Sequence, residues 1–177
     1  MSKVRVATLW LDGCSGCHMS LLDMDERLLE LAGKIELVFG PYVDVKEFPE
    51  NVDVALVEGA VASDEDLEKI RVVRARSRVL ISLGDCAVTA NVPSMRNPFG
   101  TDAVLHRAYV ENVTLQPGPP REAVPTLLPK VRPIHEFVNV DMFVQGCPPS
   151  ADTIYNVLAE ILAGRTPKMS ELTRFGA

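Results

Sequence analysis

Residues 11–18 have the sequence Leu-Asp-Gly-Cys-Ser-Gly-Cys-His, a turn that carries two cysteines. An apolar run at residues 4–9 precedes this turn, and an amphipathic pattern begins after it near Met19. This order predicts a strand, a cysteine-bearing turn and a helix. Cys86 and Cys147 each follow another apolar run far along the chain. Because the strands of a parallel sheet end at one edge, such a sheet would bring all four sulfur atoms together there.

The overall composition excludes several classes of function. The chain has 177 residues, enough for one compact domain with its own core. A formal net charge of −6 argues against a nucleic-acid partner, which needs a basic face. No apolar run reaches the ~18 residues of a membrane span, and the first residues resemble neither a secretory leader nor a twin-arginine signal. We therefore expect a cytoplasmic protein with neither a nucleic-acid nor a membrane partner.

Apolar and amphipathic runs alternate along the chain. Strands are predicted at residues 4–9, 35–39, 54–57 and 79–83, with a fifth within 137–144. Helices are predicted at residues 19–32, 63–77 and 150–164, the last two starting at a serine cap. This alternation predicts an α/β fold, specifically a flavodoxin-like parallel sheet with helices on both faces.

The first predicted helix has a clear apolar stripe. Its buried face is predicted to consist of Leu21, Leu28 and Ala32, with Leu22 and Leu29 beside them.

Residues 91–133 differ from the rest of the chain. This segment contains eight prolines and keeps neither a helical nor a strand period. Long irregular segments inside a compact domain usually serve a binding surface or a cofactor. We therefore interpret residues 1–177 as a single flavodoxin-like domain with a long irregular Pro-rich insertion at about 91–133.

The four cysteines indicate a metal centre. In a reducing compartment they are not expected to form structural disulfides, which leaves metal binding, redox chemistry or buried thiols. Structural zinc sites usually use two C-x-x-C pairs, whereas this chain has one pair, Cys14 and Cys17, and two single cysteines. Glycines flank the cysteines and Pro148 follows Cys147, as in ferredoxins. This pattern favours a [4Fe–4S] cluster; zinc, a thioredoxin-like dithiol and scattered buried thiols stay open as alternatives.

Four motifs, in order, resemble those of nickel–iron hydrogenase small subunits. They are Cys14-Ser15-Gly16-Cys17, Val57-Glu58-Gly59, Gly84-Asp85-Cys86-Ala87 and Gly146-Cys147-Pro148-Pro149. The resemblance spans nearly the whole chain and extends to the cluster-bearing subunit of respiratory complex I and to sulfhydrogenase and F420-linked relatives. It is strongest to the small subunits of the cytoplasmic, bidirectional NAD-reducing hydrogenases.

The resemblance implies a cofactor and a set of partners. Cys14, Cys17, Cys86 and Cys147 would bind the proximal [4Fe–4S] cluster, and this chain would contain no catalytic residue of its own. The nickel–iron centre would belong to a separate large subunit. Electrons would pass on to diaphorase subunits that carry iron–sulfur clusters and FMN. An FMN on this chain has no support in the sequence, because the turn after the first strand lacks a phosphate loop.

Other residues near the motifs have two interpretations each. Glu58 either handles protons or contacts the large subunit, or it is a cap or hydrogen-bond acceptor for the next loop. Asp12 and Asp85 are expected to accept backbone amides within their own turns. His18 is a neighbour of the cluster or simply a residue of the first helical turn.

Two further features concern the surface beside the cysteines. Trp10 is expected to be a core aromatic, with a role in shielding the cluster or contacting a subunit as the alternative. The segment 93–98 resembles a family stretch that packs on the large subunit.

Overall fold

The computed structural model describes residues 3–173 and contains a five-stranded parallel sheet. Its strands are β1 (Val4–Trp10), β2 (Ile35–Phe39), β3 (Val52–Glu58), β5 (Ser77–Leu83) and β7 (Met142–Val144). Their order is β2-β1-β3-β5-β7, and every neighbouring pair is parallel. Numbered among themselves the strands run 2-1-3-4-5, which is the flavodoxin-like order. The predicted fold class is confirmed, and all five predicted strands are present.

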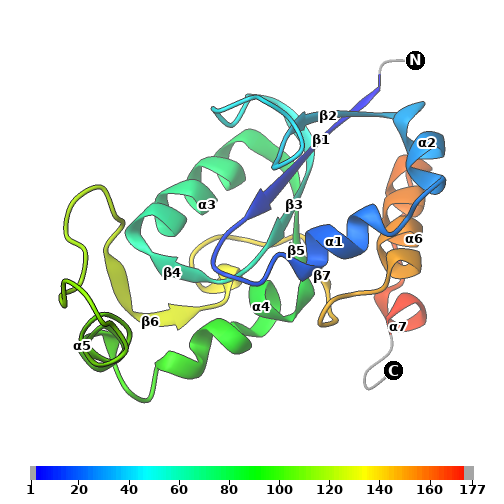
Figure 1. The fold of residues 1–177 in the computed structure, drawn as a ribbon. Coiled ribbons are helices and arrows are strands. Elements are labelled where there is room, and N and C mark those ends of the chain that lie inside the picture. The colour runs from blue at the N-terminus through cyan, green and yellow to red at the C-terminus, as the bar shows by residue number, and fades with distance from the viewer. Residues whose placement is uncertain (1–2, 174–177) are drawn as a thin grey trace.

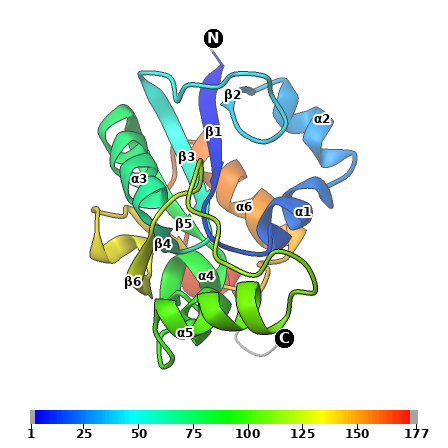
Figure 2. The ribbon, with the colours of Figure 1, turned by 60° about the vertical axis from the view of Figure 1, so that its left-hand side comes forward.

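Helices cover both faces of this sheet (Figures 1 and 2). One face packs against α1 (Gly16–Leu22), α2 (Arg27–Ala32) and α6 (Ala151–Leu162), and the other against α3 (Asp64–Arg76) and α4 (Gly84–Thr89). Strand side chains alternate between the faces, so Val54 and Leu56 join the first core while Ala55 and Val57 join the second. Double-sided burial explains why β3 is almost entirely apolar in sequence. Among the described residues, no helix is both long and apolar enough to cross a bilayer.

The two long helices begin at the predicted serine caps. The Ser63 side chain accepts a hydrogen bond from the Asp66 backbone, and the Asp66 carboxylate accepts one from Ser63 in return, which forms a capping box. Ser150 accepts a hydrogen bond from the Thr153 backbone at the start of α6. Gly164 follows α6 with φ +72°, as expected for a helix-terminating glycine.

The predicted helix at 19–32 is wrong in its middle. The chain forms two short helices, α1 and α2, with a turn at residues 23–26 in which Asp25 has φ +50°. Met24 lies on the same side as Leu21 and Leu28, because the three residues follow the i, i+3, i+7 spacing of one helix face, and it is 2% exposed in the core. Leu22 and Leu29, predicted to lie beside the buried face, are 39% and 78% exposed, and Ala32, predicted to be buried, is exposed as well.

The Pro-rich insertion contains short elements joined by irregular chain. These are the 3₁₀ helix η1 (Val92–Arg96), α5 (Thr101–His106), the π-helical turn η2 (Arg107–Glu111) and β6 (Leu127–Arg132). Strand β6 pairs antiparallel with β4 (Val61–Ser63), a pairing that the sequence did not predict. The Arg96 guanidinium donates to the Ala62 and Leu128 carbonyls and so fastens η1 to both strands. The chain then passes through η3 (Ile134–Glu136) to β7, and α7 (Met169–Leu172) follows α6.

Candidate metal centre

The four cysteines line one cavity at the carboxyl end of the sheet. Cys14 lies in the turn between β1 and α1, Cys17 in the first turn of α1, Cys86 in α4 directly after β5, and Cys147 between β7 and α6. All four contribute to the wall of a cavity of about 60 Å³. The predicted convergence of the cysteines is therefore confirmed, because parallel strands deliver their following loops to the same edge. Their role as metal ligands stays a prediction.

The cavity opens to the surface on one side. Cys17 and Cys86 are buried, whereas Cys14 and Cys147 are exposed. A cavity of this size is several times the ~10–15 Å³ that one water molecule needs. Within residues 3–173, no three His, Cys, Asp or Glu side chains converge on a point that could hold a single metal ion.

Two glycines keep the space beside the sulfur atoms open. A Cβ atom at Gly84, which has φ +80°, would overlap the Cys17 sulfur. A Cβ atom at Gly16 would lie 3.2 Å from the Cys14 sulfur. Glycine is therefore required at position 84 both by the backbone conformation and by the neighbouring thiol.

The electrostatics of the cavity disfavour four free thiolates. Burial, followed by the nearby Glu58 carboxylate, raises the pKa of the Cys17 thiol far above its ordinary value. Burial, followed by the charges of Cys14 and Cys147, raises the pKa of Cys86. The thiols are thus close enough to repel one another when ionised. A cationic metal group would remove this repulsion and deprotonate its ligands, so the donor set fits such a group.

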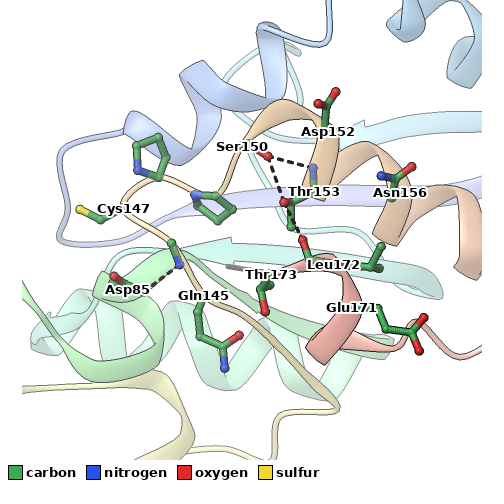
Figure 3. Close-up of a pocket in the computed structure, with 13 residues that line it drawn as sticks. Asp85, Gln145, Cys147, Ser150, Asp152, Thr153, Asn156, Glu171, Leu172 and Thr173 are labelled. Carbon is green, nitrogen blue, oxygen red and sulfur yellow. Dashed lines mark hydrogen bonds between the residues drawn. The ribbon is translucent and has the colours of Figure 1, made fainter. Parts of the chain in front are cut away.

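Hydrogen bonds join the loops that carry Cys86 and Cys147. The Asp85 backbone N–H donates to the Gly146 carbonyl at 2.9 Å, and the Gly146 N–H donates to Asp85 Oδ1 at 2.8 Å (Figure 3). Asp85 was predicted to accept an amide within its own turn, but it accepts one from the neighbouring loop instead. Asp12 pairs with Ala60 through main-chain atoms in both directions, at 3.1 and 2.7 Å. Neither aspartate contacts a cysteine sulfur through the hydrogen bonds of the described residues.

A donor that the sequence analysis missed is Asn91, directly after α4. Its side-chain Nδ2 lies 3.5 Å from the Cys147 sulfur. The next residue, Val92, donates its backbone N–H to the Cys86 sulfur. No spacing or composition signal marks Asn91 in the sequence, because its partner is 56 residues away.

Glu58 and His18 form a buried pair at the inner wall. Glu58 is 2% exposed and lines the cavity, and His18 is 5% exposed. The Glu58 carboxylate contacts His18 Nδ1 at 2.6 Å and accepts the His18 backbone N–H at 3.3 Å. Glu58 therefore holds the first turn of α1, which also carries Cys17. Glu58 was predicted to cap or accept hydrogen bonds from the next loop, but its partner is His18 in α1, so that prediction is wrong in its partner; a proton-handling role stays a prediction.

Apolar side chains are exposed on the segments next to the cysteines. We call this set the apolar rim: Trp10, Met19, Val92, Met95 and Phe99. Their exposure ranges from 50% at Trp10 to 70% at Phe99. The prediction that Trp10 is a core aromatic is wrong, because β1 ends there and the side chain turns outward, where its indole N–H donates to the Gly13 carbonyl. Exposed apolar side chains beside a site are the kind of feature that marks interaction surfaces when they are contiguous.

A second, polar cavity of about 540 Å³ lies on the other side of the Cys147 loop (Figure 3). Its walls come from residues 145–150, the first two turns of α6, and α7 with Thr173. The two cavities share Asp85, Gly146, Cys147 and Pro148, so this loop separates them. In Figure 3 the Cys147 side chain points away from the carboxylates and hydroxyls of the polar cavity.

The chain is similar to known proteins both in sequence and in structure. Residues 14–161 match the family described as "NADH ubiquinone oxidoreductase, 20 Kd subunit". The chain is 44% identical over 168 residues to the delta subunit of the NAD-reducing hydrogenase HoxS of Cupriavidus necator, covering 92% of this chain and 80% of that one. It is 38% identical to a subunit of the F420-non-reducing hydrogenase of Methanocaldococcus jannaschii, covering 94% of this chain but 58% of the relative.

Among solved structures, a chain of an NAD⁺-reducing [NiFe]-hydrogenase in the H2-reduced state superposes with a TM-score of 0.94 at 37% identity. The superposition covers 98% of this chain and 99% of that chain.

Proposed function

Since the chain belongs to the family of the 20 kDa subunit of NADH ubiquinone oxidoreductase, and within it resembles the small subunit of NAD-reducing hydrogenase, we propose that it is an electron-transfer subunit. Specifically, it is the small subunit of an NAD-linked nickel–iron hydrogenase and carries a [4Fe–4S] cluster. Hydrogen chemistry takes place in a separate large subunit, and this chain relays the electrons. Residues 1–177 act as a single domain around this site.

The observation that carries the proposal is the single cavity lined by four cysteines from three loops. Cys14, Cys17, Cys86 and Cys147 would each bind one iron through a thiolate, the ligand that such clusters prefer. When bound, the cluster supplies reversible one-electron transfer. A cavity with room for several atoms favours a cluster over a single zinc ion, whose four ligands must meet at one point.

The surrounding residues control access and charge. Buried Cys17 and Cys86 form the inner wall, and exposed Cys14 and Cys147 form the outer one. The Glu58 carboxylate adds negative charge beside Cys17, which favours the oxidised state of a nearby redox group. Exposure of two ligands brings the cluster edge to the surface, where a partner can exchange electrons with it.

The apolar rim supports a subunit interface at the same place. Met95 and Phe99 lie on the segment after α4, and Val92 is joined to Cys86 through its backbone N–H. We propose that the large subunit, with its nickel–iron centre, covers this rim. Diaphorase subunits would accept the electrons. The proposed location is the cytoplasm, where reducing conditions keep the thiols available to iron.

Purification of the tagged chain from its own host tests the assignment. We expect a larger nickel-containing subunit and flavin-containing subunits to co-purify, and the complex to reduce NAD⁺ with hydrogen. An intact complex that contains iron but no nickel would contradict the hydrogenase assignment and place the chain with complex I. Nickel together with reduction of sulfur or F420, but not of NAD⁺, would contradict only the NAD-linked part.

A further inference from the structure

We propose that Asn91 is a positioning residue that donates a hydrogen bond to the Cys147 ligand and raises the reduction potential of the bound cluster. The inference rests on the proposed function, because it assigns a role toward the cluster that Cys147 would bind. It adds a residue outside the four motifs and predicts a measurable property of the site.

The first step is geometric. Asn91 Nδ2 lies 3.5 Å from the Cys147 sulfur, within the range of an N–H···S hydrogen bond. A metal-bound thiolate has no proton and can only accept, so the amide nitrogen, not its oxygen, must face the sulfur. Cys147 is an exposed cysteine. Asn91 therefore supplies a hydrogen-bond donor to a sulfur that the core does not surround.

The second step concerns how firmly the main chain at Asn91 is held. The Asn91 backbone carbonyl accepts hydrogen bonds from the Ser94 backbone N–H at 3.2 Å and from the Ser94 hydroxyl at 2.8 Å. Val92 donates its own N–H to the Cys86 sulfur. Two consecutive residues therefore donate to two ligands that come from different strands.

The third step is electrostatic. Reduction adds an electron to a cluster and makes its sulfur atoms better hydrogen-bond acceptors. A donor held at a ligand sulfur therefore stabilises the reduced state more than the oxidised state, which raises the potential. Glu58 acts in the opposite sense on the inner side at Cys17. The reduction potential of the cluster would then depend on two opposing groups: the Asn91 donor at Cys147 and the Glu58 carboxylate at Cys17.

Two variants of Asn91 test this role. Asn91→Ala removes the side chain, and Asn91→Asp replaces the donating NH₂ with oxygen at the same size. Both are measured in the full chain with the subunits that co-purify, by redox titration followed with electron paramagnetic resonance. We expect the one-electron reduction equilibrium to shift about tenfold toward the oxidised state, which corresponds to a fall of ~59 mV. The shift should be larger for the aspartate.

Asn97→Ala is the matched control. Asn97 lies at the end of the same 3₁₀ helix and holds it to β6, donating to the Val131 carbonyl at 2.9 Å and accepting the Val131 N–H at 2.8 Å. The Asn97→Ala substitution therefore disturbs the segment without removing a hydrogen-bond donor to a cysteine sulfur. An unchanged potential in Asn97→Ala together with a lowered one in both Asn91 variants supports the proposal.

Two outcomes would overturn the inference while leaving the proposed function intact. One is an unchanged potential in both Asn91 variants at full iron content. The other is an equal shift in Asn97→Ala, which would show a merely structural effect. Absence of iron from the unmodified protein would instead overturn the proposed function itself, so the two failures are distinguishable.

Discussion

The loops that carry the cysteines and the Pro-rich insertion differ in how they are held. At the sheet edge, main-chain hydrogen bonds such as those between Asp85 and Gly146 link neighbouring loops, and glycine at position 84 leaves room for sulfur. The insertion instead exposes Met95 and Phe99 by 68% and 70%. The comparison teaches that hydrogen bonds within this chain already hold the cysteine loops together, while the insertion presents exposed apolar surface of the kind that marks interaction sites.

The largest contrast is expected between two glycines, one in each region. Gly84 and Gly100 have nearly identical φ values, +80° and +79°, but a Cβ at Gly84 overlaps the Cys17 sulfur while a Cβ at Gly100 meets nothing within 4 Å. Alanine at either position should cost ~1–2 kcal/mol of stability from the left-handed backbone. Only Gly84→Ala should also lose the bound iron, measured per folded chain. Equal iron content in the two variants would contradict the proposed geometry.

The next largest effect concerns the insertion. Phe99→Glu should weaken association with the large subunit by about 2–4 kcal/mol, because it places a charge in a buried apolar contact. It should change the unfolding free energy of this chain by less than about 0.5 kcal/mol, because the side chain is already exposed.

Leu115→Glu is the control for Phe99→Glu. Leu115 is 82% exposed in the same insertion but outside the apolar rim. Binding titrations should show little change for this variant. If Leu115→Glu weakens association and Phe99→Glu does not, the interface lies elsewhere on the insertion.

A smaller effect is expected where the two regions join. Ser63 is the last residue of β4, which pairs with β6 of the insertion, and it also caps α3. Ser63→Ala should lower the unfolding free energy by ~1 kcal/mol, since the Asp66 backbone N–H loses its acceptor. Ser63→Thr keeps the acceptor and should lose less. Denaturant unfolding distinguishes these values, and equal losses would rule out the cap as the cause.

The smallest effect depends on pH. Although burial alone would raise the pKa of Asp141, the Arg74 guanidinium at 2.6 Å and the Leu80 backbone N–H at 2.7 Å hold it below its ordinary value. A lowered folded-state pKa means that the charged carboxylate stabilises the fold above the unfolded pKa of about 3.9. This contribution disappears as the pH falls through the lower folded-state pKa.

Asp141→Asn should therefore cost less than ~1 kcal/mol at neutral pH, because the side chain is partly exposed to solvent. The difference from the unmodified protein should vanish in strong acid. Asp152→Asn, which breaks a pair with Arg27 and is 77% exposed at the carboxylate, should cost less still. Unfolding curves at several pH values measure the stability cost of both substitutions. A cost of Asp141→Asn that grows in acid would contradict the lowered folded-state pKa of Asp141.

Much of the sheet edge could be predicted from local sequence. The strands are buried on both faces, so they read as continuous apolar runs, and the cysteines follow those runs directly. The comparisons with known proteins also confirmed the resemblance that the four motifs indicated. Ser63 and Ser150 were found because capping depends only on neighbouring residues.

The features that were missed depend on contacts between distant residues. The break between α1 and α2 and the outward turn of Trp10 at the end of β1 leave no mark in the apolar periodicity. The pairing of β4 with β6 and the contact of Asn91 with Cys147 join residues about 60 apart, with no periodic signal at either end. Sequence periodicity reports which face of an element is buried, but not which distant segment covers it.

The measurement that tests the central claim most directly is the content of iron, acid-labile sulfide and zinc per chain in protein prepared without oxygen. The account predicts about four irons and about four sulfides per chain, as expected for one [4Fe–4S] cluster on four cysteines. Reduction should then produce a paramagnetic cluster signal. One zinc per chain with no sulfide would contradict the account and leave these four cysteines as a structural metal site.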